Sequence, residues 1–327
     1  MRILQHTNVQ FVKYRYWFYA FSITLLLIGL GGIIFRGLNW SIDFTSGIAA
    51  TVNLKALDPK IQPLPIEDLR STLTKNGFPE AEITYIGNPD NSIFQIKIKS
   101  IGKGTDFSTE TRNKLLEIIQ DNFPQYVQGR DLNKEVIAEI YEVGPKVGGE
   151  LRAQAFWAVM LALVAMIIYI WFRFELTFGL MGILALFHDV FMIVGIFALT
   201  GKEITMQIIA ALLTIVGYSI NDTIVIFDRI REDMKKNRKD PIQEVFNRSI
   251  NDTLSRTVIT GGTTFLTSAC LYFWGGSVIH DFAFAICLGI FFGTYSSIFV
   301  ASNLVIDLNL ITHKEKKTMQ HLTKKKK

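Results

Sequence analysis

An aspartate inside an apolar segment is the residue of this sequence best suited to chemistry. Asp222 lies in a segment that begins near Thr205 and contains the run Gly217–Glu232. A charged side chain at the centre of a membrane helix costs about 2.5 to 3.5 kcal/mol, so such residues usually face a partner or a water-filled path. Asp222, with Asn221 beside it, is therefore a candidate proton carrier. Two alternatives stay open, a position in the headgroup region and a purely structural hydrogen-bonding role.

A second charge, Arg256, enters the next apolar segment along the chain. One loop joins the two segments, so Asp222 and Arg256 could meet on facing helices, and pairing would lower the cost of both charges. Burial favours the neutral form of a carboxyl group and a nearby cation favours the charged form, so such a pair could couple proton transfer to helix movement. Alternatively, Arg256 extends to lipid headgroups.

Three further polar residues are predicted to support this site. His188 and Asp189 lie in another apolar segment and could relay protons, although neighbours on a helix point about 100° apart, so we expect only one of them to face a given partner. Asp228 lies about 9 Å further along its helix than Asp222 and is predicted to mark the cytoplasmic surface. An aspartyl protease dyad of Asp189 and Asp222 is disfavoured, because no glycine-opened catalytic helix is nearby.

Long apolar blocks must position these residues. The chain has 327 residues, 49% of them hydrophobic, and a mean hydropathy of +0.28, which is typical of a membrane protein. Each block is close to the roughly 20 residues that cross a bilayer. We therefore predict a polytopic α-helical membrane protein with six transmembrane helices, at residues 16–35, 153–172, 176–200, 205–227, 257–274 and 282–306.

The positions of Lys and Arg predict the orientation. Basic residues precede the first span, follow the last and fill the segment between the fourth and fifth, which places both termini in the cytoplasm. The pI near 9.0 then reflects topology, and no nucleic-acid partner is expected. The predicted regions are a cytoplasmic N-terminus (1–15), helix one (16–35), a periplasmic domain with linkers (36–150), helices two to six (151–306) with a cytoplasmic loop (229–255), and a basic cytoplasmic tail (307–327).

The segment between helices one and two is predicted to form a small α+β domain. Its patterns indicate strands at 48–54, 82–85, 92–98 and 136–143 and helices at 65–76 and 107–122. The order βαββαβ matches a ferredoxin-like split-βαβ sandwich. Its acidic residues are scattered and it contains neither His nor Cys, so we expect a binding or mechanical role.

Short polar and glycine-containing passages connect this domain to the membrane. Asp43 is either a solvated turn residue or part of a fixed junction that orients the domain. Glycine and proline permit turns, so the second passage, Val143–Glu150, is a candidate pivot. The candidate hinge and junction residues are Asp43, Gly47, Gly144, Pro145, Gly148 and Gly149.

Several kinds of chemistry are not indicated. The sequence has no GxxxxGK[ST] motif, so ATP hydrolysis by a P-loop is excluded and an ion gradient is the expected energy source. Cys270 and Cys287 form no CxxC pair and are predicted to be core residues, with neither a disulfide nor a metal site. We predict neither an enzyme nor a cofactor.

Four blocks of the sequence form a characteristic combination: Asn39–Thr45, Val143–Gly149, Gly217–Arg229 and Ser255–Thr257. Together they resemble the SecF branch of the SecD/SecF family of bacterial protein-export membrane proteins, within the resistance-nodulation-division superfamily. The resemblance covers nearly the whole chain. It implies an inner-membrane subunit that acts with SecD and the SecYEG channel, within the lipid bilayer, to export preproteins by the proton-motive force. The family's proton-coupling Asp and Arg correspond to Asp222 and Arg256.

One residue departs from the family pattern, and two other function classes stay open. Ser46 stands where the family usually has Gly, which leaves the conformation of that turn open. A passive scaffold of the translocon is the main alternative, and it would tolerate a neutral residue at Asp222. A small-molecule exporter half is more distant, because about 100 residues is small for a drug-binding domain.

Overall fold

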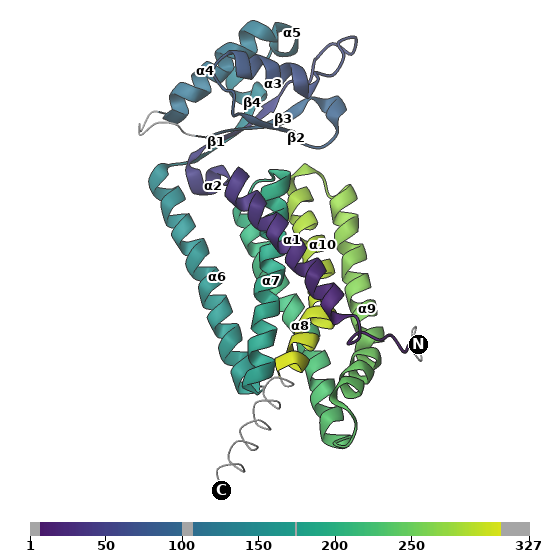
Figure 1. The fold of residues 1–327 in the computed structure, drawn as a ribbon. Coiled ribbons are helices and arrows are strands. Elements are labelled where there is room, and N and C mark those ends of the chain that lie inside the picture. Colours follow the sequence, from purple (N-terminus) through teal and green to yellow (C-terminus); the bar gives the residue numbers. More distant parts are fainter. Residues whose placement is uncertain (1–6, 100–106, 174, 309–327) are drawn as a thin grey trace.

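The computed structural model describes residues 7–99, 107–173 and 175–308, which form a bundle of long helices with an α+β domain at one end (Figure 1). The first described residues and the last lie toward the opposite end of the bundle, where Arg15 forms an ion pair of 2.9 Å with Asp307. Both ends of the described chain are therefore on one side. Of the predicted basic tail (307–327), residues 309–327 lie outside the described residues.

Five helices of the described chain are long and apolar enough to cross a membrane. The helix predicted as the fifth span, α9, is not among them. The part of it predicted as the span, 257–274, carries five threonines and two glycines, which lower its hydropathy. The long helices are α1 (Arg15–Arg36), α6 (Pro145–Arg173), α7 (Leu176–Thr200), α8 (Met206–Lys236), α9 (Ile242–Trp274) and α10 (Ser277–Tyr295), and the π-helix η3 (Ser296–Ala301) continues α10.

The connection between α8 and α9 differs from the prediction. We expected a loop over 229–255 with a short surface helix, but both long helices run on and only 237–241 connects them. Ion pairs hold the extended ends together, Arg248 with Asp233 at 2.8 Å and Arg229 with Asp252 at 2.5 Å. These cross-helix pairs stabilise a helical hairpin that hydropathy alone could not reveal.

Helices α7 and α1 pack closely because small residues face each other at their contact. A Cβ atom added to Gly195 of α7 would lie only 2.7 Å from the Cα of Gly29 in α1. The backbones therefore touch, as small residues allow in membrane helices. On α10, Gly289 packs against Ile215 of α8 in the same way, and Gly293 packs against Ser219.

The α+β domain contains a four-stranded antiparallel sheet in the order β2-β3-β1-β4. The chain forms its strands and main helices in the predicted sequence. These elements are β1 (Gly47–Asn53), α3 (Ile66–Lys75), β2 (Glu82–Tyr85), β3 (Ile93–Lys99), α4 (Phe107–Asn122) and β4 (Ile137–Val143). Shorter elements are η1 (Pro89–Asn91), α5 (Pro124–Val127) and η2 (Leu132–Val136).

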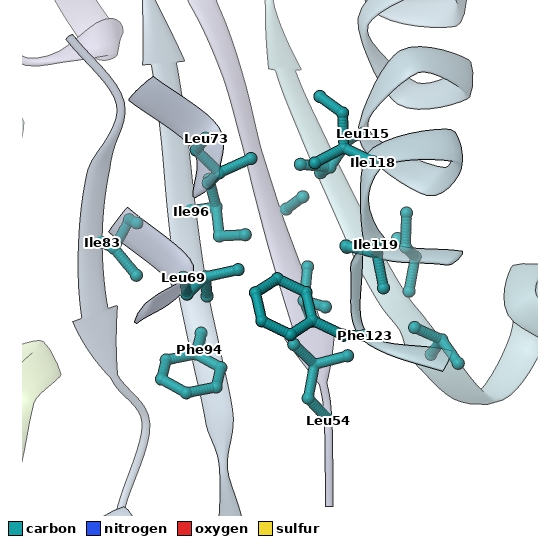
Figure 2. Packing of buried hydrophobic residues seen from close by; sticks show 14 of the residues in the cluster. Leu54, Leu69, Leu73, Ile83, Phe94, Ile96, Leu115, Ile118, Ile119 and Phe123 are labelled. Atoms are coloured by element: carbon teal, nitrogen blue, oxygen red, sulfur yellow. The ribbon is translucent and has the colours of Figure 1, made fainter. Parts of the chain in front are cut away.

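One face of this sheet forms the core of the domain (Figure 2). Alternate residues of β3 are buried, including Phe94 and Ile96, because successive side chains of a strand point to opposite faces. Leu69 and Leu73 of α3 and Ile119 of α4 cover them. The opposite face, with the polar residues of β3, faces the ends of the bundle helices.

A short helix that the sequence did not predict, α2 (Ile42–Thr45), joins α1 to β1. The hydroxyl of Ser41 caps it by accepting from the amide of Asp43 at 3.2 Å. The preceding segment pairs with residues 203–204, where the amide of Ile204 donates to the carbonyl of Asn39 at 2.7 Å. The junction is therefore fixed to the bundle by backbone hydrogen bonds.

The predicted pivot after β4 is mostly helical. Helix α6 begins at Pro145, so Gly148 and Gly149 lie within its first turns and only Gly144 separates strand from helix. A Cβ atom at Gly148 would lie 3.3 Å from the backbone of Phe44 in α2. Gly148 therefore serves close packing between α6 and α2, and the expected flexible passage is shorter than predicted.

Candidate functional site

Asp222 is buried in α8 against α9, with 7% of its surface exposed. Its Oδ1 atom accepts a hydrogen bond of 2.9 Å from the hydroxyl of Thr257. Its Oδ2 atom is buried and has no hydrogen-bond partner within the described part of the chain. A buried carboxylate with one unsatisfied oxygen is costly in its charged form, so this site favours a bound proton.

Arg256 lies on α9 next to Thr257 and is exposed. It attracts the carboxylate of Asp222 electrostatically, but within the described residues no hydrogen bond or ion pair joins the two side chains. The direct partner is Thr257, which the sequence analysis did not single out. Asn221 is exposed on α8 and does not take part in the buried contact.

A second buried cluster surrounds Asp189 of α7, which is 1% exposed. Its Oδ2 accepts from the hydroxyls of Ser219 at 2.6 Å and of Ser296 at 2.8 Å. Its Oδ1 lies 2.9 Å from Nδ1 of His188. We expected these two neighbours to face different partners, but their side chains fold toward each other and form one cluster.

Further hydroxyl groups extend this cluster along α8 and η3. Thr223, directly after Asp222, lies 2.7 Å from the hydroxyl of Ser297 and donates to the carbonyl of Ser219 at 3.2 Å. Ser296 and Ser297 begin the π-helix η3. Such bulges are frequent at functional sites because they turn a side chain that a regular helix would direct elsewhere.

The remaining predicted residues lie outside this buried region. Asp228 pairs with Arg173 near the end of the bundle away from the α+β domain. Asp43 accepts a hydrogen bond of 3.1 Å from the amide of Met206, the first residue of α8. It therefore takes part in a fixed junction. Gly47 has a φ of +153°, and a side chain there would overlap the carbonyl oxygen of Ile98.

Sequence signals existed for some of the partners that the predictions missed. Ser219 lies within the run around Asp222, three residues earlier, and neighbours at this spacing share a helix face. Thr257 adjoins the candidate Arg256. Ser296 follows an apolar segment with no pattern of its own, and its role depends on the π-helix. The hydrogen bonds of Asp189 join α7 to α8 and to η3, and the sequence alone could not predict that these three elements meet there.

The cysteines and the metal-ligand types add no further site. Cys270 is exposed on the bundle and Cys287 is half-buried, so the prediction that Cys270 is a core residue is wrong. Residue 270 lies on a face of α9 that no other described helix covers. Within residues 7–99, 107–173 and 175–308, no group of three or more His, Cys, Asp or Glu residues could hold a metal ion.

Apolar helices, buried acidic residues and an α+β domain after the first helix define a polytopic membrane protein. The family model for the C-terminal part of the protein export membrane proteins SecD/SecF matches residues 125–310. The translocase subunit SecF of Desulfurispirillum indicum is 42% identical over 93% of this chain and 92% of its own length. SecF of Rhodothermus marinus is 40% identical over 94% and 96%.

The chain therefore belongs to the SecD/SecF family of protein-export membrane proteins, and its relatives place it in protein translocation. It is also 45% identical to the SecDF translocase subunit of Thermus thermophilus over 88% of this chain and 37% of that longer one. The crystal structure of SecDF from Thermus, titled a translocon-associated membrane protein, superposes with a TM-score of 0.76 at 40% identity. The superposition covers 94% of this chain and 40% of the Thermus chain.

Proposed function

We propose that this chain is a proton-coupled subunit of a protein-export translocase in the cytoplasmic membrane, and that Asp222 carries the proton. The observation that supports this most is the buried carboxylate with a single hydroxyl donor and an unsatisfied oxygen. A residue with only a structural role would be expected to have both oxygens satisfied, because an unpaired buried polar atom costs about 1 to 3 kcal/mol.

The two protonation states of Asp222 favour different arrangements of α8 and α9. When it is neutral, the carboxyl group can remain where it is, with Thr257 at one oxygen and apolar surroundings at the other. When Asp222 is ionised, its carboxylate is stabilised most by approaching the positive charge of Arg256, which directly precedes Thr257 on α9. Proton binding and release would then shift the two helices relative to each other, since interactions that differ between two states bias their populations.

The cluster around Asp189 would support this step. It joins α7, α8 and η3 by hydrogen bonds to one buried carboxyl group. The hydroxyls of Thr223 and Ser297 contact each other and extend this cluster along α8 and η3. Such groups can both donate and accept, so they can orient a proton without binding it permanently.

The proposed topology has six spans, with α9 as the fifth, and both termini in the cytoplasm. The α+β domain then lies on the periplasmic side, and its order of elements and strands supports a ferredoxin-like fold. The relative in which SecD and SecF are one chain supports SecD as the partner. The SecYEG channel and preproteins in transit complete the proposed assembly.

Proton entry into vesicles tests this function directly. The chain is reconstituted with SecD in liposomes that contain a pH-sensitive dye, and a proton gradient is imposed. We expect Asp222→Asn to reduce proton entry to the level of protein-free vesicles, because the amide cannot release a proton. The exposed carboxylate of Glu244 on α9 provides the control, and Glu244→Gln should retain the wild-type rate. A wild-type rate in Asp222→Asn would contradict the proposal, and a wild-type protein without proton entry would favour the scaffold.

A further inference from the structure

A polar cleft of about 540 Å³ separates the α+β domain from the ends of the bundle helices. The sheet contributes its polar face, because the apolar residues of β3 point the other way, into the domain core. The bundle contributes the connection between α7 and α8 and the start of α10. The elements that line this cleft lie at the end of the bundle next to the α+β domain (Figure 1), and none of the residues of the cluster around Asp189 belongs to its lining.

Two carboxyl groups meet in this cleft, one from each side. Glu82 is the first residue of β2 and Glu203 lies just before α8, and both line the cleft. Lys97, which lies opposite Glu82 in the pairing of β2 with β3, forms an ion pair with Glu203. Neighbouring groups hold each of them in place. Glu203 pairs with Lys97, and Glu82 accepts from the side-chain amide of Asn39 at 3.0 Å and lies 3.8 Å from Lys99.

The burial of Glu203 favours a bound proton on this pair of acids. The side chain of Glu203 is 10% exposed, and its Oε1 atom is buried without a donor within the described part of the chain. Two ionised carboxylates cannot form a hydrogen bond, because both only accept. A carboxyl group on Glu203 that donates to Glu82 satisfies the buried oxygen and removes the repulsion between like charges.

We propose that Glu82 and Glu203 form a proton-binding site that fastens the α+β domain to the helical bundle. With the proton bound, the pair closes the cleft. When the proton leaves, two negative charges face each other and the sheet lifts from the bundle about its two tethers, at Gly47 and Gly144. This site binds its proton independently of Asp222.

The titration of the pair supports this site. Burial first, and then the hydrogen bond to Glu82, raises the pKa of Glu203 from its ordinary value of 4.5 to about 7, although Lys97 acts in the opposite direction. Burial also opposes ionisation of Glu82, but hydrogen bonds from Glu203 and Asn39 and the two lysines outweigh it and lower its pKa. The pKa values of the two acids therefore move apart, and Glu203 is the one whose neutral form is favoured.

The sign of the pH dependence follows from the raised pKa. The closed cleft binds one proton more than the open cleft between pH 4.5 and about 7. Closure is therefore strongest at the acidic end of this range and weakens as the pH rises, by at most about tenfold per pH unit because one proton is involved. The other charged groups that line the cleft or adjoin the pair are Asp43 of α2, Arg70 of α3, Lys97 and Lys99 of β3, Lys202, and Asp281 of α10.

Two of these acids have other partners. Asp281 forms an ion pair with Lys202 within the bundle, which balances that part of the cleft. The carboxylate of Asp43 accepts a hydrogen bond from the amide of Met206. Glu203 differs from them because one of its buried oxygens has no donor within the described part of the chain.

A distance measurement between the two sides of the cleft tests the proposal. Spin labels are placed at Thr74→Cys on α3 and Val278→Cys on α10, both exposed, in the full chain with Cys270→Ala and Cys287→Ala, in lipid nanodiscs. Pulsed electron paramagnetic resonance then gives the distance distribution from pH 5 to pH 8. We expect one short distance at pH 5 and a growing population of longer distances as the pH rises.

Variants separate proton binding from a structural role. Glu203→Gln keeps a donor but cannot ionise, so it should hold the short distance at every pH. Glu82→Gln removes the negative charge that raises the pKa of Glu203, so the change should move to lower pH. Asp222→Asn and Glu80→Gln, an exposed acid near β2, should behave as the wild type.

The opposite results overturn the proposal. A wild-type distance that does not change between pH 5 and pH 8 excludes a proton-dependent contact. A pH response that persists unchanged in both Glu203→Gln and Glu82→Gln assigns it to other groups. If the pH response of the distance disappears in Asp222→Asn, the response depends on Asp222 in the bundle. The carboxyl pair would then not control the opening of the cleft.

Discussion

At Asp222, one threonine hydroxyl is the direct partner of a carboxyl group buried between α8 and α9. A single neutral donor stabilises a carboxylate much less than a set of charged donors does. Arg256 is the nearby positive charge, but it stays exposed. The balance between proton binding and attraction to Arg256 therefore depends on small changes in the positions of these side chains.

Substitution of Thr257 should affect the buried carboxyl group of Asp222 directly. Thr257→Val has nearly the same shape but removes the only donor to Asp222 within the described residues. We expect it to lower the free energy of unfolding by about 1 to 3 kcal/mol, because a buried acceptor loses its partner. Chemical unfolding in detergent measures the change. Thr257→Ser keeps the hydroxyl and is the matched control, and equal stability of the Val and Ser variants would contradict the role of this bond.

Ser46 adopts a backbone conformation that favours glycine. Its φ of +73° and ψ of +153° lie in a region that residues with a Cβ atom rarely occupy, at a cost of about 1 to 3 kcal/mol. Ser46→Gly should therefore raise the free energy of unfolding by about 1 kcal/mol. Ser46→Ala, which retains the Cβ atom, should give no such gain. A lower stability of the glycine variant in chemical unfolding would show that the serine side chain outweighs the strain.

Among the elements, those with a continuous or periodic apolar pattern were predicted best. The bounds of α7 (Leu176–Thr200), β2 (Glu82–Tyr85) and α4 (Phe107–Asn122) agree with the prediction. Helix α2 was missed because four residues carry no period, and its stability comes from the Ser41 cap and contact with the bundle. The spacing of apolar residues along the sequence predicts which face of an element is buried. A cap and a contact with a distant helix produce no such spacing.

The candidate site could be predicted only in part, for a similar reason. An acidic residue in an apolar helix and a basic residue at the start of the next are visible in the sequence, so Asp222 and Arg256 were found. Which residue of α9 touches the carboxyl group depends on the rotation of one helix against the other. That rotation makes Thr257 the partner, and the bulge of η3 brings Ser296 to Asp189.

The close packing of helices α1 and α7 gives a prediction about stability. Gly195→Ala adds a methyl group where the Cα of Gly29 is only 2.7 Å away, so the two helices must separate. We expect a loss of about 1 to 3 kcal/mol in the free energy of unfolding, as for other overpacked contacts. Gly31→Ala on α1, where the nearest atom is 4.0 Å away, should be close to neutral. Equal effects in chemical unfolding would contradict close packing at Gly195.

The whole molecule has one core in the α+β domain and others in the bundle, joined by a narrow junction. Separate cores allow the two parts to move relative to each other, since few apolar contacts cross between them. The proposed proton sites lie in different places, one between α8 and α9 and one at the cleft. A movement of the bundle helices at the first site could therefore reach the domain through α8, whose first residue is bonded to Asp43 of the junction.

Preprotein export into inverted membrane vesicles under an imposed proton gradient tests proton coupling through Asp222 most directly. The wild-type chain is compared with Asp222→Asn and with the control Glu244→Gln, after equal assembly with SecD has been verified for all three. We predict that Asp222→Asn loses the part of export that depends on the gradient and keeps the rest, while Glu244→Gln matches the wild type. Unchanged gradient-dependent export in Asp222→Asn would contradict proton coupling at this residue.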